Sequence, residues 1–294
     1  MIIVKLIGGL GNQLFQYALG RNLAIKNNTE LKLDISGFED YKLHKYGLHH
    51  FNIAENIATK EEIQKFKPVK RQFLSRLSGK ISKHILPWYK QKWIIEPNFL
   101  YNSDIFKIKR DAYLDGYWQS EKYFIDIAEI IRNEFIVKND PGGLNQEMLK
   151  IIHDTHSVSL HIRRGDYFSN LKTKEIHGVL GLEYYWKSLN LIGEKVKDPQ
   201  IFVFSDDIPW TRDNLKTDLP LHFIDHNGVE KNYEDLRLMS NCKYHIIANS
   251  SFSWWGAWLS TNADKITIAP SRWVNDPSRD MRDIVPENWI KINN

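Results

Sequence analysis

Two adjacent arginines, Arg163 and Arg164, end an alternating stretch at residues 157–167, SVSLHIRRGDY. A guanidinium group is planar and permanently charged, so it can hold a phosphate or a carboxylate through two parallel hydrogen bonds. If the stretch is a strand, His161 and Arg163 face the same side of the sheet, because successive side chains alternate. The pattern indicates a strand end that binds an anion. An ion pair between Arg163 and Asp166 beside a turn is the alternative.

A glycine-rich segment, GGLGNQ at residues 8–13, follows a β-branched run and precedes a helical pattern. Its glycines let backbone N–H groups approach an anionic or sugar ligand at the N-terminus of a helix. The spacing is not G-x-G-x-x-G and no Walker lysine follows, so a redox dinucleotide site is not favoured. The candidate ligand-binding residues of this segment are Gly9, Gly11, Asn12 and Gln13.

Polar residues also stand at two expected helix N-termini. Asn249, Ser250 and Ser251 precede an aromatic helical segment, where they can either cap the helix or bind a pyrophosphate. Asp235, in NYEDLRLMS, can accept hydrogen bonds from a guanine edge, although an acid in the first helical turn is favoured by the helix dipole in any case.

Metal chemistry is not expected. Asp206 and Asp207 follow a strand pattern and could bind a cation, but the two arginines can neutralise a diphosphate without one. The single cysteine, Cys242, allows neither an intramolecular disulfide nor a cysteine metal cluster, and a reducing cytosol fits this usage best.

These residues must be positioned by alternating strands and helices. We expect strands at 2–7, 30–35, 112–118, 158–163, 200–205, 221–224, 243–248 and 265–269, and helices at 11–26, 121–135, 182–196, 209–215, 232–241 and 252–261. One or two basic amphipathic helices are expected between 61 and 86, and a linker or loop at 139–143. This order predicts parallel, doubly wound sheets, which collect ligands at the carboxyl ends of their strands.

A chain of 294 residues with 42% hydrophobic and 26% charged residues is typical of a soluble globular protein with two domains. The net charge of the chain is +4, and the excess of basic residues is concentrated in residues 63–95, which contain nine lysines and arginines and no acid. This argues against a whole-protein nucleic-acid binder and for one basic surface. No stretch is long and apolar enough to span a membrane, so we expect a cytoplasmic protein, with peripheral membrane association through 63–95.

Five segments together carry a family resemblance: GGLGNQLFQYALG at 8–20, GYWQSEKYF at 116–124, HIRRGDY at 161–167, VFSDD at 203–207 and NSSFSWWGAWL at 249–259. In this order and spacing they resemble the bacterial α-1,2-fucosyltransferases of glycosyltransferase family 11. The resemblance spans most of the chain except about 51–95. It implies an α/β fold of GT-B type, with two Rossmann-like domains facing across a cleft. It also implies catalysis without a metal or other cofactor.

The resemblance assigns an acceptor-side domain to 1–150, with a basic helical insertion around 61–92, and a GDP-fucose-binding domain to 151–294. Its implied catalytic residues are Arg163, Asn12 and Asp166. Its implied donor-binding residues are His161, Arg163, Arg164, Asp235, Asn249, Ser250, Ser251, Gly9, Gly11 and Asn12, and its acceptor-binding residues are Gln13, Trp118 and Glu121. No general base is evident from the motifs, and the candidates are Asp115, Glu121 and a histidine in the cleft.

The function that follows is inverting transfer of L-fucose from GDP-β-L-fucose to the 2-hydroxyl of a galactoside, in a glycan such as an O-antigen. Three alternatives stay open at this point. One is a fucosyltransferase of another linkage or acceptor, including a protein acceptor. A second is a carbohydrate-binding lectin that uses the many aromatic side chains. The third is an RNA-binding protein that uses the basic stretch.

Overall fold

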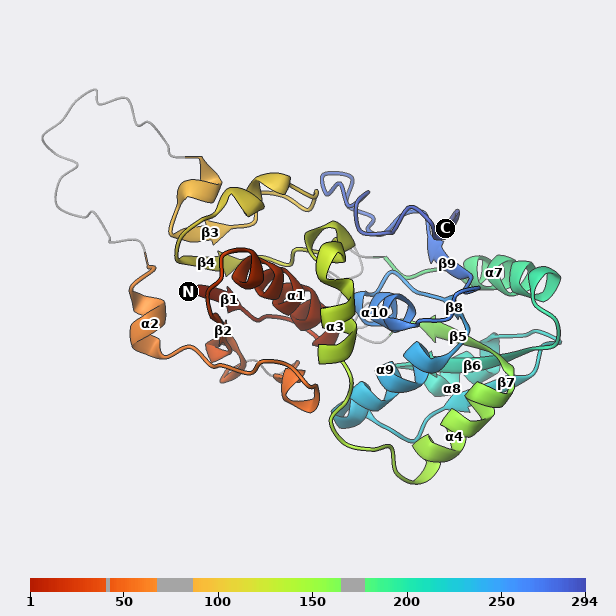
Figure 1. Cartoon of the computed structure of the whole chain (residues 1–294). Coiled ribbons are helices and arrows are strands. Elements are labelled where there is room, and N and C mark those ends of the chain that lie inside the picture. Colours follow the sequence, from red (N-terminus) through yellow and green to blue (C-terminus); the bar gives the residue numbers. More distant parts are fainter. Residues whose placement is uncertain (41–42, 68–86, 165–177) are drawn as a thin grey trace, which may run out of the picture. The chain divides into compact units, whose positions relative to one another are not determined.

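The computed structural model describes residues 1–40, 43–67, 87–164 and 178–294. The chain divides into two compact units (Figure 1). Unit 1 comprises Met1–Tyr46 and Ile53–Ile131, and unit 2 comprises Gly47–Asn52 and Arg132–Asn294. The sequence placed the boundary between 150 and 151. The two compact units divide at 131/132, with the helix that follows the linker in unit 2, and the assignment of the two domains to acceptor and donor stays a prediction.

Unit 1 is a parallel α/β unit. Its described elements are β1 (Ile2–Lys5), α1 (Leu10–Lys26), β2 (Leu31–Asp34), α2 (Lys60–Gln64), β3 (Trp93–Ile95), β4 (Ala112–Asp115) and α3 (Ala128–Glu134), the last of which crosses the boundary. The strands are parallel in the order β2-β1-β4-β3. Helix α1 packs on β1 and β2, with Leu14, Phe15 and Ala18 buried.

Unit 2 has the larger described sheet. Its elements are α4 (Gly143–Asp154), β5 (His156–Ile162), α7 (Leu182–Lys195), β6 (Pro199–Ser205), α8 (Ile208–Asn214), β7 (Leu221–Ile224), α9 (Asn232–Asn241), β8 (Tyr244–Ile246), α10 (Ser251–Leu259), β9 (Thr267–Pro270) and β10 (Ile290–Ile292). The strands are parallel, in the order β10-β9-β8-β5-β6-β7.

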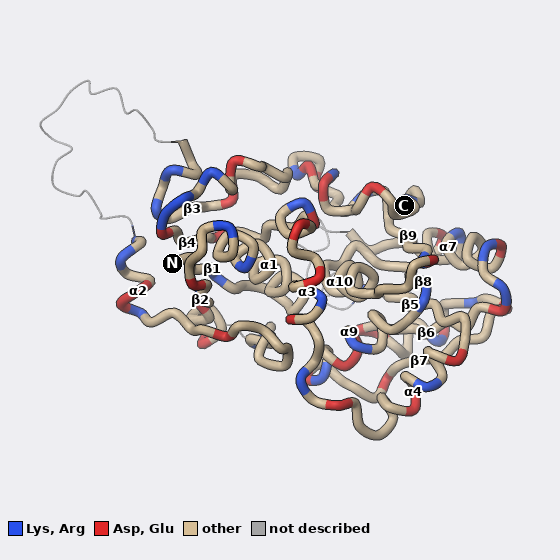
Figure 2. Tube along the Cα trace, viewed as in Figure 1, with Lys and Arg blue, Asp and Glu red and all other residues tan. Residues whose placement is uncertain are grey.

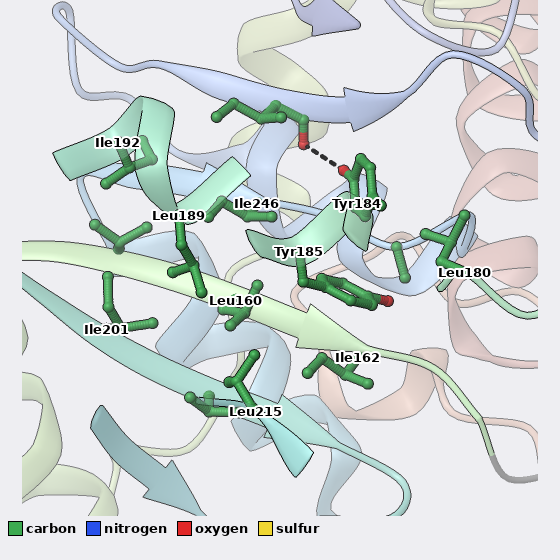
Figure 3. Close-up of a cluster of buried hydrophobic side chains, with 14 of the residues drawn as sticks. Leu160, Ile162, Leu180, Tyr184, Tyr185, Leu189, Ile192, Ile201, Leu215 and Ile246 are labelled. Atoms are coloured by element: carbon green, nitrogen blue, oxygen red, sulfur yellow. Dashed lines mark hydrogen bonds between the residues drawn. The ribbon is translucent and has the colours of Figure 1, made fainter. Parts of the chain in front are cut away.

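Alternation along the strands of unit 2 supplies a core on each face of its sheet. Leu160 and Ile162 of β5 pack with Leu189 of α7 in the cluster that Figure 3 shows. Phe202 and Phe204 of β6 point the opposite way, into a cluster that contains residues of α4 and α9. Strand β6 is apolar on both faces and contains a continuous hydrophobic run, as expected for a parallel sheet covered by helices on both sides, whereas β5 alternates with the buried polar residues Ser157, Ser159 and His161.

The structure confirms the expected α/β class and the two Rossmann-like units of a GT-B fold. It corrects several elements. The helix expected at 121–135 is two 3₁₀ turns, Glu121–Tyr123 and Ile125–Ile127, followed by α3. The elements β3, β10 and α4 were missed, because two are three-residue strands and α4 begins at Gly143, within the segment interpreted as a linker.

The basic region is described only in part. Helix α2 begins with a capping box between Thr59 and Glu62 and ends at Gln64, whereas residues 68–86, where most of the basic helical pattern falls, lie outside the described residues. Figure 2 shows acidic and basic residues interspersed along both units. None of the helices that the structure describes is both long enough and apolar enough to cross a membrane.

Candidate functional site

The strand order of unit 2 identifies where a ligand is expected. The first strand, β5, lies inside the sheet, with β6 on one side and β8 on the other. The chain runs outward through β6 and β7 and then returns to build β8, β9 and β10 on the opposite side. Ligands of open parallel sheets bind at such a switch point, outside the carboxyl ends of the strands. In this unit the switch point lies between the ends of β5 and β8.

The two arginines follow β5 directly and meet the two aspartates that follow β6. The Arg163 Nη1 atom lies 3.0 Å from an Asp206 carboxylate oxygen, and the Arg164 Nε atom lies 3.5 Å from Asp207. The Arg164 backbone N–H donates to Asp206 at 2.8 Å, and the Arg164 guanidinium stacks 3.4 Å above the ring centroid of Trp210. Both guanidinium groups are thereby held in fixed orientations.

The alternative ion pair between Arg163 and Asp166 is not tested, because Asp166 lies outside the described residues. Arg163 is paired with Asp206, from the neighbouring strand end, and Asp206 and Asp207 serve as partners of arginines. Asp166 lies outside the described residues, so its predicted role stays a prediction. Within the described residues, no group of three or more His, Cys, Asp or Glu side chains is placed to hold a metal ion.

His161 lies beneath this cluster on β5. Its ring is almost fully buried and lies 5.8 Å, centroid to centroid, from the Phe252 ring at the start of α10. Burial, together with the charge of Arg163, lowers the pKa of His161 to about 3, with Asp206 opposing the shift, so the imidazole is neutral. Its Nδ1 atom is buried without a hydrogen-bond partner among the described residues. Buried polar atoms normally have partners, so this nitrogen is a candidate ligand contact.

The residues after β8 are largely occupied by local structure. Ser250 is the N-cap of α10, and its hydroxyl accepts the Phe252 backbone N–H at 3.3 Å. The Asn249 side-chain amide donates to the carbonyls of Trp273 at 3.2 Å and Gly178 at 3.4 Å, so it fastens neighbouring loops to the strand end. Ser251, the first residue of α10, is half-buried.

Asp235 lies in the first turn of α9, as predicted. Its carboxylate accepts the Asn227 side-chain N–H at 2.7 Å, and Asn227 exchanges hydrogen bonds with Asn145 of α4. Burial raises the pKa of Asp235 to about 7, which the neighbouring charge of Glu234 reinforces and the Asn227 hydrogen bond opposes. Asp235 is therefore a rigidly held carboxylate whose charge changes near neutral pH.

The carboxyl edge of unit 1 is built from glycine and amide side chains. Gly8 has a φ of +77°, and a Cβ atom there would lie 2.5 Å from the Asn12 side-chain nitrogen. Gly9 is the N-cap of α1 and Gly11 lies in its first turn, in agreement with the helix expected at 11–26. The Asn12 side-chain oxygen accepts the Gln119 side-chain N–H at 2.8 Å, which joins the segments after β1 and β4.

Two of the three predicted acceptor-binding side chains are buried. Gln13 has no exposed surface, and its amide donates to the carbonyls of Gly8 at 3.0 Å and Lys45 at 2.9 Å. Trp118 is also fully buried and packs edge-on against Tyr123. Packing and backbone hydrogen bonds engage both side chains in this structure, and their predicted acceptor contacts stay predictions. Glu121 begins a 3₁₀ turn and is half-buried.

Sequence reasoning missed three polar side chains at this edge, namely Gln16, Glu96 and Gln119. Gln16 accepts the Ile7 backbone N–H and donates to the Gly116 carbonyl, each at 3.0 Å, and so bridges β1 and β4. Glu96 follows β3 directly. The β-branched pair before Glu96, with Pro97 after it, was the available signal for a short strand ending in an acid.

Residues 1–293 match the protein-family model described as Glycosyl transferase family 11. An alpha-1,2-colitosyltransferase of Escherichia coli is 38% identical over 300 residues, covering 99% of each chain. The E. coli O-antigen biosynthesis glycosyltransferase WbnK is 31% identical over 309 residues, covering 98% of this chain and 99% of its own. Among solved structures, a mutant of Arabidopsis thaliana FUT1 in complex with GDP shares the fold with a TM-score of 0.51 at 10% identity, covering 98% of this chain and 75% of that one.

Proposed function

The chain belongs to glycosyl transferase family 11 and is a glycosyltransferase, and we propose that it transfers L-fucose from GDP-β-L-fucose to the 2-hydroxyl of a galactoside. The observation that carries the proposal is the pair of oriented guanidinium groups, Arg163 and Arg164, at the switch point of unit 2. Guanidinium forks match the geometry of a diphosphate, and the N-terminus of α10 follows the neighbouring strand β8.

The aspartates do not prevent this use of the arginines. A guanidinium group has five N–H donors, so one edge can stay on Asp206 while another meets a phosphate oxygen. Asp206 would then orient Arg163 as a fixed donor. Such preorganised donors are effective in catalysis because they need no reorientation as charge develops.

In the proposed reaction, the acceptor oxygen attacks the anomeric carbon from the face opposite the diphosphate. The new C–O bond forms as the bond between the anomeric carbon and the phosphate oxygen breaks, and its electron pair leaves with GDP. The β linkage of the donor becomes an α linkage in the product. Arg163 and Arg164 would stabilise the charge that builds on the departing diphosphate.

The remaining donor contacts are assigned by position. The neutral imidazole of His161 would hydrogen-bond the nucleotide or its phosphates, and Ser250 and Ser251 would present the N-terminus of α10 to them. Asp235 would accept from the two adjacent N–H groups of guanine. In unit 1, Asn12 would contact the transferred sugar, while the hydrogen bond from Gln119 fixes the orientation of the Asn12 side chain.

Transfer of colitose is the second candidate, and the relative at 38% identity favours it. Colitose is L-fucose without its 3-hydroxyl group, so the two donors differ at a single position. A site that hydrogen-bonds that hydroxyl rejects the deoxy sugar by about 10⁴-fold or more, whereas an apolar pocket discriminates by only about 10². The ratio of kcat/KM for the two donors therefore reports the chemistry of the pocket.

The test is to incubate the protein with GDP-fucose or GDP-colitose and a panel of β-galactosides, and to determine the product linkage by NMR. We expect an α-1,2 linkage, and no product from a matched 2-deoxygalactoside. Another linkage, or transfer to the 2-deoxygalactoside, would contradict the proposed reaction. Stable galactoside binding without turnover, and without thermal stabilisation by GDP, would instead indicate a lectin.

We also propose that no metal is required, because two arginines supply the positive charge that a diphosphate needs. In the same assay, EDTA should leave the transfer rate unchanged. A loss of activity that Mg²⁺ or Mn²⁺ restores would contradict this.

Peripheral attachment to a membrane is proposed from charge alone, since residues 63–95 carry nine basic and no acidic residues. Sedimentation with anionic vesicles, compared with neutral ones, measures it. Equal retention by both kinds of vesicle, or by neither, would contradict an electrostatic contact.

A further inference from the structure

Glu96 is a carboxylate at the carboxyl edge of the unit 1 sheet. It follows the last residue of β3, and its backbone N–H donates to the Asp115 carbonyl at the end of β4. Ligands of a parallel sheet collect at this edge. The segment that follows β4 also carries Gln119, whose side-chain amide donates a hydrogen bond to the Asn12 side chain. Glu96 therefore lies at the same sheet edge as Asn12, the residue that the proposed function assigns to the transferred sugar.

The position of the carboxylate is fixed by the backbone that follows β4. One Glu96 carboxylate oxygen accepts the Tyr117 N–H at 2.7 Å, and the other accepts the Trp118 N–H at 3.0 Å. Gly116 makes this approach possible, because a Cβ atom there would lie 2.4 Å from the Glu96 Cβ. With two bonds to main-chain donors, the carboxylate cannot swing away as a surface side chain does.

The turn that holds Glu96 is strained. Trp118 has a φ of +56°, in the left-handed region that costs a residue with a Cβ atom about 1 kcal/mol or more. Strained backbone of this kind concentrates at functional sites, where the surrounding structure enforces it. Here the enforcing contacts are the Glu96 carboxylate and the burial of the Trp118 ring.

The charge state of Glu96 suits a proton acceptor. Burial raises its pKa to about 7, although the two backbone hydrogen bonds oppose the shift. The charged groups at the ends of the neighbouring strands, Asp115 of β4 and Lys5 of β1, are paired with each other at 3.1 Å. A base with a pKa near the working pH is unprotonated often enough to act and basic enough to hold a proton.

Asp115, one of the bases guessed from the sequence, is less suited to this role. Both of its carboxylate oxygens lie within hydrogen-bonding distance of the Lys5 ammonium, at 3.1 and 3.2 Å. Both oxygens of Asp115 are therefore already engaged by a cation. Glu96 has backbone partners in place of a cation.

We propose that Glu96 is the general base that removes the proton from the acceptor hydroxyl, an inference that rests on the proposed function. The hydroxyl proton passes to a Glu96 carboxylate oxygen while the hydroxyl electron pair forms the bond to the anomeric carbon. The diphosphate leaves with the electrons of the broken C–O bond. The products are the glycoside, GDP and protonated Glu96, which releases its proton to solvent.

The competing explanation is that Glu96 only fastens the strained turn. The Glu96→Gln variant distinguishes a general base from a structural contact, because glutamine has the same length and keeps one acceptor oxygen but cannot take the proton. We expect kcat to fall at least about 100-fold, the lower end for loss of general base catalysis, while stabilisation by GDP is unchanged. The matched control is Glu129→Gln, which alters an exposed acid in the first turn of α3 and should leave kcat unchanged.

The pH profile distinguishes a base from a structural contact. In the wild type, kcat should rise as pH increases through about 7 and then level off, because only ionised Glu96 accepts a proton. Glu96→Gln should lack this rise. Glu96→Asp retains a carboxylate at a shorter reach, so we expect a reduced kcat that still rises with pH. If Glu96→Gln does not fold, the kcat and pH profile of Glu96→Asp still test the role of Glu96.

If the wild type is active, three outcomes would overturn the role of Glu96 as general base and leave the proposed function intact. They are near-wild-type kcat in Glu96→Gln, persistence of the pH rise in that variant, and loss of the pH rise in a folded Glu96→Asp. Absence of transfer by the wild type, from either GDP-sugar to any galactoside, would instead overturn the proposed function, and this assignment with it.

Discussion

The carboxyl edges of the two sheets hold different combinations of side chains. In unit 2, Arg163 and Arg164 face Asp206 and Asp207 at 3.0 and 3.5 Å, so the edge is a cluster of formal charges. In unit 1, the ends of β1 and β4 are joined by an ion pair, Lys5–Asp115, and the segments after them by neutral amides, such as the Asn12–Gln119 pair. Both units are parallel α/β sheets, so the difference lies in the residues that follow the strands. Function resides in such sites and not in the shared fold.

The two edges are also held in place differently. The guanidinium groups of unit 2 are oriented by side-chain partners, Asp206 and Asp207. Unit 1 relies on its backbone, with φ values of +77° at Gly8 and +56° at Trp118. Charged forks suit a diphosphate, whereas a rigid edge of amides and a half-buried carboxylate with no cationic partner at its two backbone hydrogen bonds, Glu96, suits sugar hydroxyls. The comparison predicts that mutations at the two edges affect different steps.

The largest effect is expected at Arg163. Arg163→Lys keeps the charge but loses the planar fork, so kcat should fall by about 10² to 10³, the usual result of removing one preorganised donor. Steady-state transfer from the GDP-sugar measures it. The matched control is Arg212→Lys, since Arg212 forms an exposed ion pair with Asp225 on the same unit. Near-wild-type turnover in Arg163→Lys would contradict the proposed role of the Arg163 guanidinium in stabilising the departing diphosphate.

A smaller effect is expected on nucleotide binding at Asp235. Burial raises the pKa of this carboxyl to about 7, and guanine recognition needs its charged form, so the affinity for GDP should weaken as pH falls below about 7. Asp235→Asn should weaken GDP binding by about tenfold or more and abolish this pH dependence, because a hydrogen bond to a charged group contributes about 1.5–3 kcal/mol.

Isothermal titration calorimetry with GDP between about pH 5.5 and 8 measures both quantities. Asp213→Asn, which changes an exposed acid of α8, is the control and should bind GDP as the wild type does. If GDP affinity is independent of pH in the wild type, Asp235 does not read guanine, and the donor specificity of unit 2 must come from other residues.

The smallest effect is expected at Gly8, and it falls on stability. Gly8→Ala places a methyl group 2.5 Å from the Asn12 side-chain nitrogen at a φ of +77°, so we expect about 1–2 kcal/mol of destabilisation. Gly142→Ala is the control, because its Cβ atom would meet no atom within 4 Å and its φ is −109°, so its change should stay within about 0.5 kcal/mol. Urea unfolding measures both. Equal stabilities would show that the Gly8 turn is not constrained.

Much of the fold was predictable because its signals are local. The helix at 11–26 and the strand at 158–163 were found within a few residues of α1 and β5 from hydrophobic periodicity. The elements that were missed, β3 and β10, have three residues each, too few for a period to be visible. Helix α4 was missed because it begins directly after a Pro-Gly pair, which is a strong loop signal.

The candidate site was likewise predictable only where its signals are local. Residue types and strand ends alone placed Arg163 and Arg164 where an anionic ligand is expected, and the helical pattern placed Asp235 in the first turn of a helix. Which groups pair across strands depends on sheet order, which no local pattern records. Arg163 meets Asp206, forty-odd residues away, because β5 and β6 are neighbours, while Gln13 and Trp118 are buried by packing that their own segments do not reveal. Glu96 gained its raised pKa from burial beside the turn after β4, a contact that depends on the pairing of β3 with β4.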